Sequence, residues 1–109
     1  MPKSNGLPPG TLILLILRVV RQAPLHGYAI AQKIRALSSD QLSVEEGSLY
    51  PALQKLLANG WVRAEWTTSD TGRQVRSYRI TAKGLKQLES EQDDYQRMAD
   101  AIAAILQST

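Results

Sequence analysis

The sequence contains no cysteine and only one histidine, His26, among its 109 residues. Without cysteine the chain forms no disulfide and offers no thiolate ligand to a metal ion. A single histidine cannot build a zinc site by itself. We therefore expect no metal site, and we interpret His26 as a structural residue at the start of a helix. The absence of cysteine fits a reducing interior but does not by itself establish one.

Long apolar segments are also missing. The most apolar stretch, residues 12–17 with Val19 and Val20, is far shorter than the roughly 20 residues that cross a bilayer. Pro8 and Pro9 interrupt the opening of the chain, and no convincing cleavage site follows the apolar stretch, which argues against a signal peptide. The sequence therefore predicts a cytoplasmic protein with no membrane partner.

No arrangement of catalytic groups is recognisable. The sequence shows no nucleophile patterned with a base and an acid, and no glycine-rich phosphate loop. The acidic pairs at residues 45–46 and 93–94 are sequential, so their carboxylates do not share a helix face. We expect neither an enzyme nor a bound cofactor.

The charge that is present is unevenly distributed. The chain has 13 Lys and Arg residues and 10 Asp and Glu residues, a formal net charge of +3. Residues 1–86 hold 12 basic and five acidic residues, a local +7, whereas residues 87–109 hold one basic and five acidic residues, a local −4. This segregation predicts a body that faces a polyanion and a tail that faces elsewhere.

Apolar spacing predicts two N-terminal helices. After a loose arm at residues 1–7, Pro8 and Pro9 suit the first turn of a helix that ends near Gln22 and is apolar on nearly all sides. A second helix runs from about residue 26 to 37, followed by a polar loop and a short strand at residues 42–44. The inner face of the second helix is expected to hold Ile30, Ile34 and Leu37.

A third helix precedes a β-hairpin. Its apolar face comprises Leu49, Leu53, Leu56 and Leu57. Pro51 inside a helix costs about 3 kcal/mol, so we expect the helix to start near Gly47 or Ser48 and to leave their N–H groups free for a phosphate. Asn59-Gly60 ends it.

Two strands and a last helix complete the chain. Alternation predicts strands at residues 62–67 and 75–80 around a turn at residues 69–72. Thr81 is a good N-cap for a helix that reaches about Gln107. The inward positions of the hairpin are expected to be Val62, Ala64, Trp66, Tyr78 and Ile80.

The last helix carries a heptad-like stripe with alternating spacings of three and four residues. The stripe comprises Leu85, Leu88, Gln92, Tyr95, Ala99, Ile102 and Leu106. It is too long for a contact with its own domain alone, and the first helix, with Leu12 and Leu15, also lacks a partner. We expect a homodimer through these residues, with Gln92 fixing the register.

Four segments resemble the PadR family of bacterial transcriptional regulators, and the resemblance covers nearly the whole chain. They are Leu25-His26-Gly27-Tyr28, Gly47-Ser48-Leu49-Tyr50-Pro51-Ala52-Leu53, Gly60-Trp61 and Tyr78-Arg79-Ile80-Thr81-Ala82-Lys83-Gly84. The short C-terminal part is similar to the compact subfamily with one last helix, and residues 61–66 look closest to an acidobacterial branch. The resemblance implies an α+β, mostly helical fold, with a winged helix-turn-helix over residues 1–80 and a dimerisation helix over 81–109. It also implies a homodimer that represses transcription from a palindromic operator in double-stranded DNA.

The resemblance and the helix wheel together suggest the residues that contact DNA. They are Tyr28, Ser48, Tyr50, Gln54, Lys55 and, on the hairpin or wing, Arg73, Arg76 and Arg79. Tyr28 suits a core position nearly as well, Tyr50 suits packing, and the charges suit a solvated face. Relatives often have a basic run where this chain has residues 74–77, so its wing carries fewer charges.

Other functions remain open. Some relatives stack planar hydrophobic effectors on aromatic residues of the dimer contact, which makes Tyr95 a candidate ligand-binding residue, although simple packing in the contact is favoured. Trp61 and Trp66 are expected to pack at the base of the wing. The same fold also serves as a protein-interaction module or as a small-molecule-binding scaffold without DNA affinity.

Overall fold

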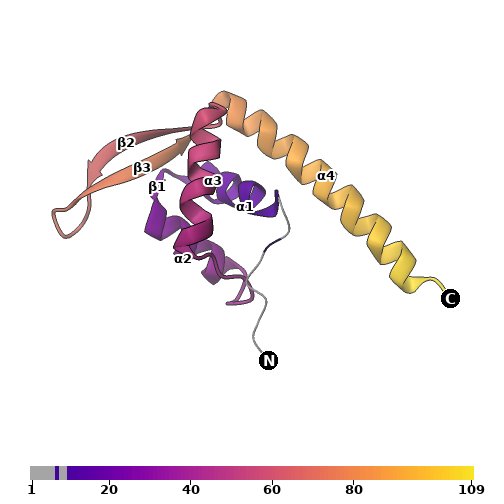
Figure 1. The fold of residues 1–109 in the computed structure, drawn as a ribbon. Coiled ribbons are helices and arrows are strands. Elements are labelled where there is room, and N and C mark those ends of the chain that lie inside the picture. Colours follow the sequence, from indigo (N-terminus) through magenta and orange to yellow (C-terminus); the bar gives the residue numbers. More distant parts are fainter. Residues whose placement is uncertain (1–6, 8–9) are drawn as a thin grey trace.

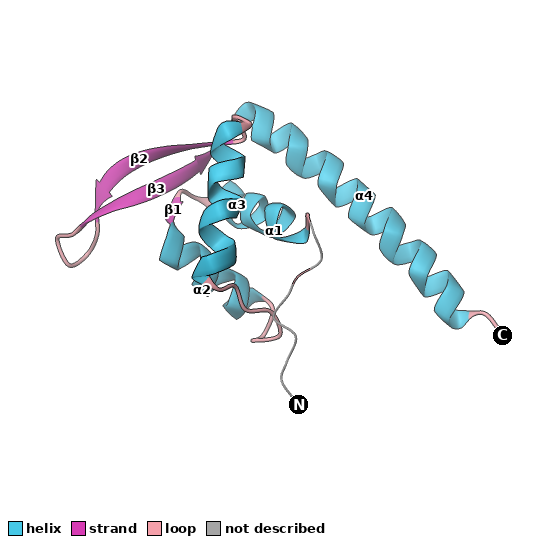
Figure 2. Cartoon of the chain, viewed as in Figure 1, coloured by secondary structure: helices cyan, strands magenta, loops and turns pink. Residues whose placement is uncertain are grey.

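The computed structural model describes Leu7 and residues 10–109. These residues form four helices and three strands in the order α1, β1, α2, α3, β2, β3 and α4 (Figures 1 and 2). The fold is α+β and mostly helical, and its hairpin extends from a body of three helices as the wing of a winged helix-turn-helix does. This confirms the predicted fold class. The predicted loose arm at residues 1–7, except Leu7, and the two prolines after it lie outside the described residues.

Helix α1 spans Thr11–Gln22 and forms the centre of the core. It begins after Gly10, whose φ of 87° is the left-handed conformation that glycine tolerates best. Its buried side chains are Ile13, Ile16, Leu17, Val19 and Val20. Leu12, Leu14 and Leu15 are only half-buried and pack at the edge of the core. The helix therefore has one face fully covered and another partly open, as its all-round apolar sequence indicated.

The next segment contains a strand that the sequence did not reveal. Strand β1, Leu25–His26, pairs antiparallel with β3, and α2 follows at once as Gly27–Leu37. Two residues are too few to show alternation, so no pattern could indicate β1. The strand predicted at residues 42–44 is wrong: this segment has no regular structure, and the Leu42 N–H donates to the Ser38 hydroxyl at 2.9 Å.

Leu37 was also placed wrongly on the inner face of α2. Ile30 and Ile34 are buried, but Leu37 is 69% exposed. It lies in the last turn of the helix, just before Ser39 and Asp40 adopt positive φ values of 54° and 66°. The end of α2 extends beyond the core, so Leu37 is exposed even though it lies on the same side of the helix as Ile30 and Ile34.

Helix α3, Glu46–Ala58, starts slightly earlier than predicted. Pro51 is therefore the sixth helical residue rather than part of the first turn, and the bond from residue 51 to Gly47 is missing because proline has no N–H. The Ser48 and Leu49 N–H groups both donate to the Glu45 carbonyl, at 3.0 and 2.9 Å. The expectation of a free Ser48 amide is therefore wrong.

The C-terminal end of α3 agrees with the sequence. Leu49, Leu53 and Leu56 are buried, and Leu57 is half-buried. Gly60 has a φ of 73°, and its N–H donates to the Leu57 carbonyl at 3.0 Å, while Trp61 N–H donates to Leu56 at 3.0 Å. This pair of bonds is the Schellman arrangement that ends a helix at glycine.

Strands β2, Val62–Thr68, and β3, Gln74–Ile80, form the wing in a sheet of order β1-β3-β2. At its base the wing buries Val62 and Tyr78 against the helices. Farther out the hairpin extends beyond the body (Figure 1). Trp66 lies on that outer part and is 68% exposed, so the expectation that it packs at the base of the wing is wrong.

Helix α4, Ala82–Gln107, is anchored at its first turn and then leaves the body (Figure 1). The Thr81 hydroxyl accepts a hydrogen bond from the Gly84 N–H at 2.9 Å and lies 2.7 Å from the Gly60 carbonyl, to which it can donate. Leu88 is buried in the core, whereas residues 92–98 are all exposed. No helix in the described part of the chain is both long and apolar enough to cross a membrane.

Candidate nucleic-acid interface

The outer face of α3 is polar and open to solvent. Ser48, Pro51, Gln54 and Lys55 are exposed, on the side opposite the buried leucines. In helix-turn-helix proteins the second helix of the motif presents this face to the major groove. Ser48, Gln54 and Lys55, which the sequence predicted as DNA contacts, are thus all exposed to solvent on α3.

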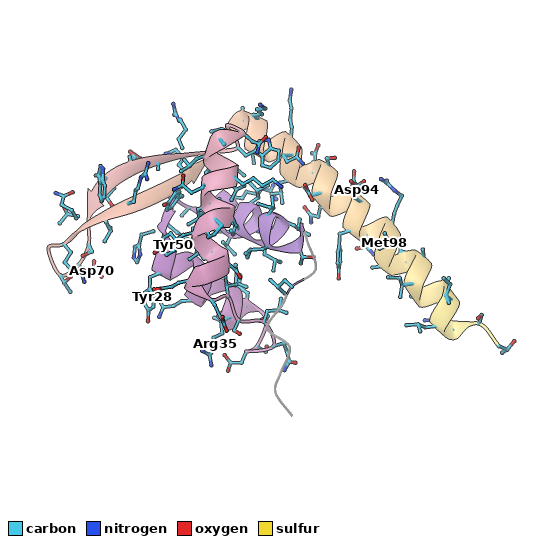
Figure 3. The ribbon with its side chains drawn as sticks, in the orientation of Figure 1. Tyr28, Arg35, Tyr50, Asp70, Asp94 and Met98 are labelled. Carbon is cyan, nitrogen blue, oxygen red and sulfur yellow. The ribbon has the colours of Figure 1, made fainter. Side chains whose placement is uncertain are left out.

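Two tyrosines lie beside this face, on the side from which the wing extends (Figure 3). Tyr28, at the start of α2, is 66% exposed and is therefore not a core residue. Tyr50 is 43% exposed and packs one edge on Gly27, where an added Cβ would lie 3.0 Å from the Tyr50 hydroxyl. Gly27 lets Tyr50 lie against the start of α2 while the rest of the ring remains open.

The three wing arginines do not share one surface. Arg73 lies in the turn, next to Gly72 with its φ of 85°. Arg76 pairs across the strands with Trp66, on the sheet face that also carries Tyr78. Arg79 is on the opposite face, where its Nε lies 3.7 Å from a carboxylate oxygen of Glu65. Arg79 therefore lies on the other face of the wing from Arg76, as their spacing of three residues along a strand requires.

Elements α2, α3 and the wing converge on one open groove of about 640 Å³, which we call the wing groove. Its lining includes Tyr28, Glu46, Tyr50, Trp66, Arg73 and Arg76. Burial raises the pKa of the Tyr78 phenol at the base of the groove above its ordinary 10.0, with smaller opposing effects from Arg76, which lowers it, and Tyr50, which raises it. Two guanidinium groups and four tyrosine or tryptophan rings therefore line the same groove.

Helix α4 presents a different surface. Its exposed apolar side chains are Leu85, Tyr95, Met98, Ile102, Ile105 and Leu106. Leu88, predicted for the dimer contact, is only 3% exposed because it packs into the core of its own chain. Met98 and Ile105 were missed, although Tyr95, Met98, Ile102 and Ile105 show the same three–four–three spacing as the predicted stripe.

Within residues 7 and 10–109, no three His, Asp or Glu side chains gather in a way that would hold a metal ion. His26 is half-buried at the end of β1, where its backbone forms the N-cap of α2 without a side-chain cap bond.

Residues 16–90 match the model of the Transcriptional regulator PadR-like family. The chain belongs to this family. Its members are regulatory DNA-binding proteins rather than typical enzymes. A PadR-like regulator from Bacillus cereus has a similar structure, with 28% identity and a TM-score of 0.78 over 92% of this chain and 95% of that one. A protein from Streptococcus mutans is 28% identical, with a TM-score of 0.79 over 99% of this chain and 93% of that one.

Sequence relatives extend the comparison. The chain is 36% identical to an uncharacterized 37.1 kDa protein in a transposon of Streptomyces fradiae, over 89 residues, or 82% of this chain. That alignment covers only 24% of the Streptomyces protein, so the PadR-like chain spans about a quarter of its length.

Proposed function

We propose that this PadR-like chain is a homodimeric repressor that binds a palindromic operator and acts in the cytoplasm. The observation that carries the proposal is the convergence of α2, α3 and the wing on one basic groove beside the open face of α3. Phosphates attract such a surface, and an exposed helix face supplies contacts to base edges. In this proposal Ser48, Gln54 and Lys55 contact DNA from α3.

Dimerisation is the second part of the proposal. The exposed apolar stripe of α4 lies on a helix that leaves the body, and a second copy of this chain would cover it. The half-buried Leu12 and Leu15 would extend the contact. A two-fold dimer would set two recognition helices about 34 Å apart, one turn of DNA, to match an inverted repeat.

The test uses a labelled duplex from the chain's own upstream region and a scrambled duplex, titrated at two salt concentrations. We expect tighter binding to the upstream duplex and a steep loss of affinity with salt. Failure to retard or bind either duplex would favour the protein-interaction or small-molecule alternatives. Repression is tested by deleting the gene, which should raise transcription from the promoter that carries the operator.

A matched pair of variants locates the wing contact. Arg73→Ala should lower affinity and reduce the salt slope by about 1, because one phosphate contact is lost. Arg79→Ala removes the same charge from the opposite sheet face, beside Glu65, and should leave the slope unchanged. Equal losses in the two variants would show that the wing is not oriented toward DNA as proposed.

A planar hydrophobic effector belongs to the same proposal. Tyr95 is 55% exposed in a single chain, so a binding site there would need the partner's α4 to enclose it. Titration with a planar apolar dye should quench tyrosine fluorescence in the dimer and not in the Tyr95→Ala variant. An identical response in both would remove Tyr95 from the proposal.

A further inference from the structure

Trp66 is a large aromatic side chain on the outer part of the wing that the chain itself does not cover. It is 68% exposed, whereas the other tryptophan, Trp61, is half-buried and packs against the core. Single exposed apolar residues are common on protein surfaces. The position of Trp66 is informative because of the neighbours with which it shares the wing groove.

The wing groove combines aromatic rings with positive charge. Trp66 lies directly across the strands from Arg76, a pairing that brings Cβ atoms to about 5 Å. Tyr28 and Tyr50 line the same groove with 66% and 43% of their surfaces exposed. Arg73 enters it from the turn. Apolar rings and guanidinium groups therefore share one open surface.

A DNA backbone offers a partner to both kinds of side chain, because it carries anionic phosphates and largely apolar deoxyriboses. Guanidinium groups hydrogen-bond phosphates in a fork geometry. The flat face of an indole offers apolar area to a sugar at little cost in side-chain entropy. Charge complementarity favours this polyanion, because Glu46 is the single acidic side chain among the described residues that line the groove.

We propose that the Trp66 indole contacts a deoxyribose of bound duplex DNA, next to the phosphates held by Arg73 and Arg76. The inference rests on the proposed function and adds a residue to it. Sugar and phosphate contacts position a protein without reading sequence. Trp66 therefore strengthens binding to operator and to unrelated duplex by the same factor, and it does so without contributing to the salt dependence.

The first test uses fluorescence. The variant Trp61→Phe leaves Trp66 as the sole tryptophan, and Trp66→Phe leaves Trp61. Acrylamide quenching is measured for both with and without saturating duplex, whose binding is followed independently by the anisotropy of a label on the DNA. We expect duplex to lower the quenching of Trp66 toward that of half-buried Trp61, and to leave Trp61 itself unchanged.

The second test uses affinity. Trp66→Ala should weaken binding to the upstream and scrambled duplexes equally, by about tenfold, with the salt slope of the parent. Arg76→Ala should instead flatten the slope. Because Trp66 is exposed, its replacement leaves the core intact, which circular dichroism verifies.

The outcomes separate the inference from the function it rests on. Duplex that binds normally while Trp66 stays equally quenchable overturns the contact and leaves the regulator proposal standing. A flattened salt slope in Trp66→Ala also overturns it, because Trp66 would then act by orienting Arg76. Absence of duplex binding in the parent protein refutes the proposed function itself.

Discussion

Gly84→Ala tests how α4 is fixed to the rest of the fold. A Cβ built at Gly84 lies 2.0 Å from the Trp61 carbonyl oxygen and 2.8 Å from Ile80 Cγ1. Ordinary contact begins near 3.4 Å, so the first turn of α4 would have to retreat by about 1.4 Å. The atom it meets is backbone, which cannot rotate away.

The displacement of α4 should lower the free energy of unfolding, and the contacts at the junction give its size. Two hydrogen bonds cross this junction: the Thr81 hydroxyl donates its single proton toward Gly60 O at 2.7 Å, with Trp61 O also within 3.1 Å, and Thr81 N–H donates to Trp61 O at 3.0 Å. Each contributes about 1 kcal/mol net, and overpacking adds about 2 kcal/mol. The better helix propensity of alanine returns about 1 kcal/mol. We expect a net loss of about 3 kcal/mol, a large part of the roughly 5–15 kcal/mol that stabilises a domain.

The assay is urea unfolding followed by circular dichroism and tryptophan fluorescence, at one fixed chain concentration because dimerisation contributes to stability. Gly47→Ala is the matched control: it makes the same chemical change in a helix, but nothing lies within 4 Å of its new carbon. We expect Gly47→Ala to match or slightly exceed the parent in stability. If Gly84→Ala unfolds at the same urea concentration as Gly47→Ala, the close contact between α4 and Trp61 is refuted.

Two further predictions concern the α4 stripe and the core. Ile105→Asp should convert the dimer to monomers, as measured by light scattering, because the dimer contact would bury one new charge from each chain. Ala104→Asp places the same charge on the polar side of α4, with Asp100, and should leave the dimer intact. A dimer that survives Ile105→Asp would contradict dimerisation through the exposed apolar stripe of α4. Burial raises the folded-state pKa of Tyr78, so the folded chain holds this proton more tightly and stability should fall as pH rises above about 10. Tyr78→Phe should flatten that fall, measured as the urea midpoint against pH, and an unchanged pH dependence would exclude Tyr78 as its source.

Much of this fold could be predicted from the sequence, because helices and their ends depend on residues close together in the chain. Periodic leucines predicted α3, Gly60 predicted its end, and Thr81 predicted the start of α4, because helix faces and caps depend on residues within one or two turns. Errors arose where a neighbour distant in sequence decides the outcome. Leu37 and Trp66 are on the inner sides of their helix and strand, but both elements extend beyond the core at these positions. The apolar spacing along one element does not indicate how far the core extends.

The sequence by itself determined the order of the elements, their caps and the separation of a basic body from an acidic last helix, since these follow from residue types at short spacing. Only the tertiary structure decided which side chains share a surface. It buried Leu88, left Met98 and Ile105 open, and placed Trp66 in one groove with Tyr28 and Tyr50. The physical reason is that strand register and the junction of α4 with Trp61 join segments far apart in the chain, and these contacts set the direction in which each face points.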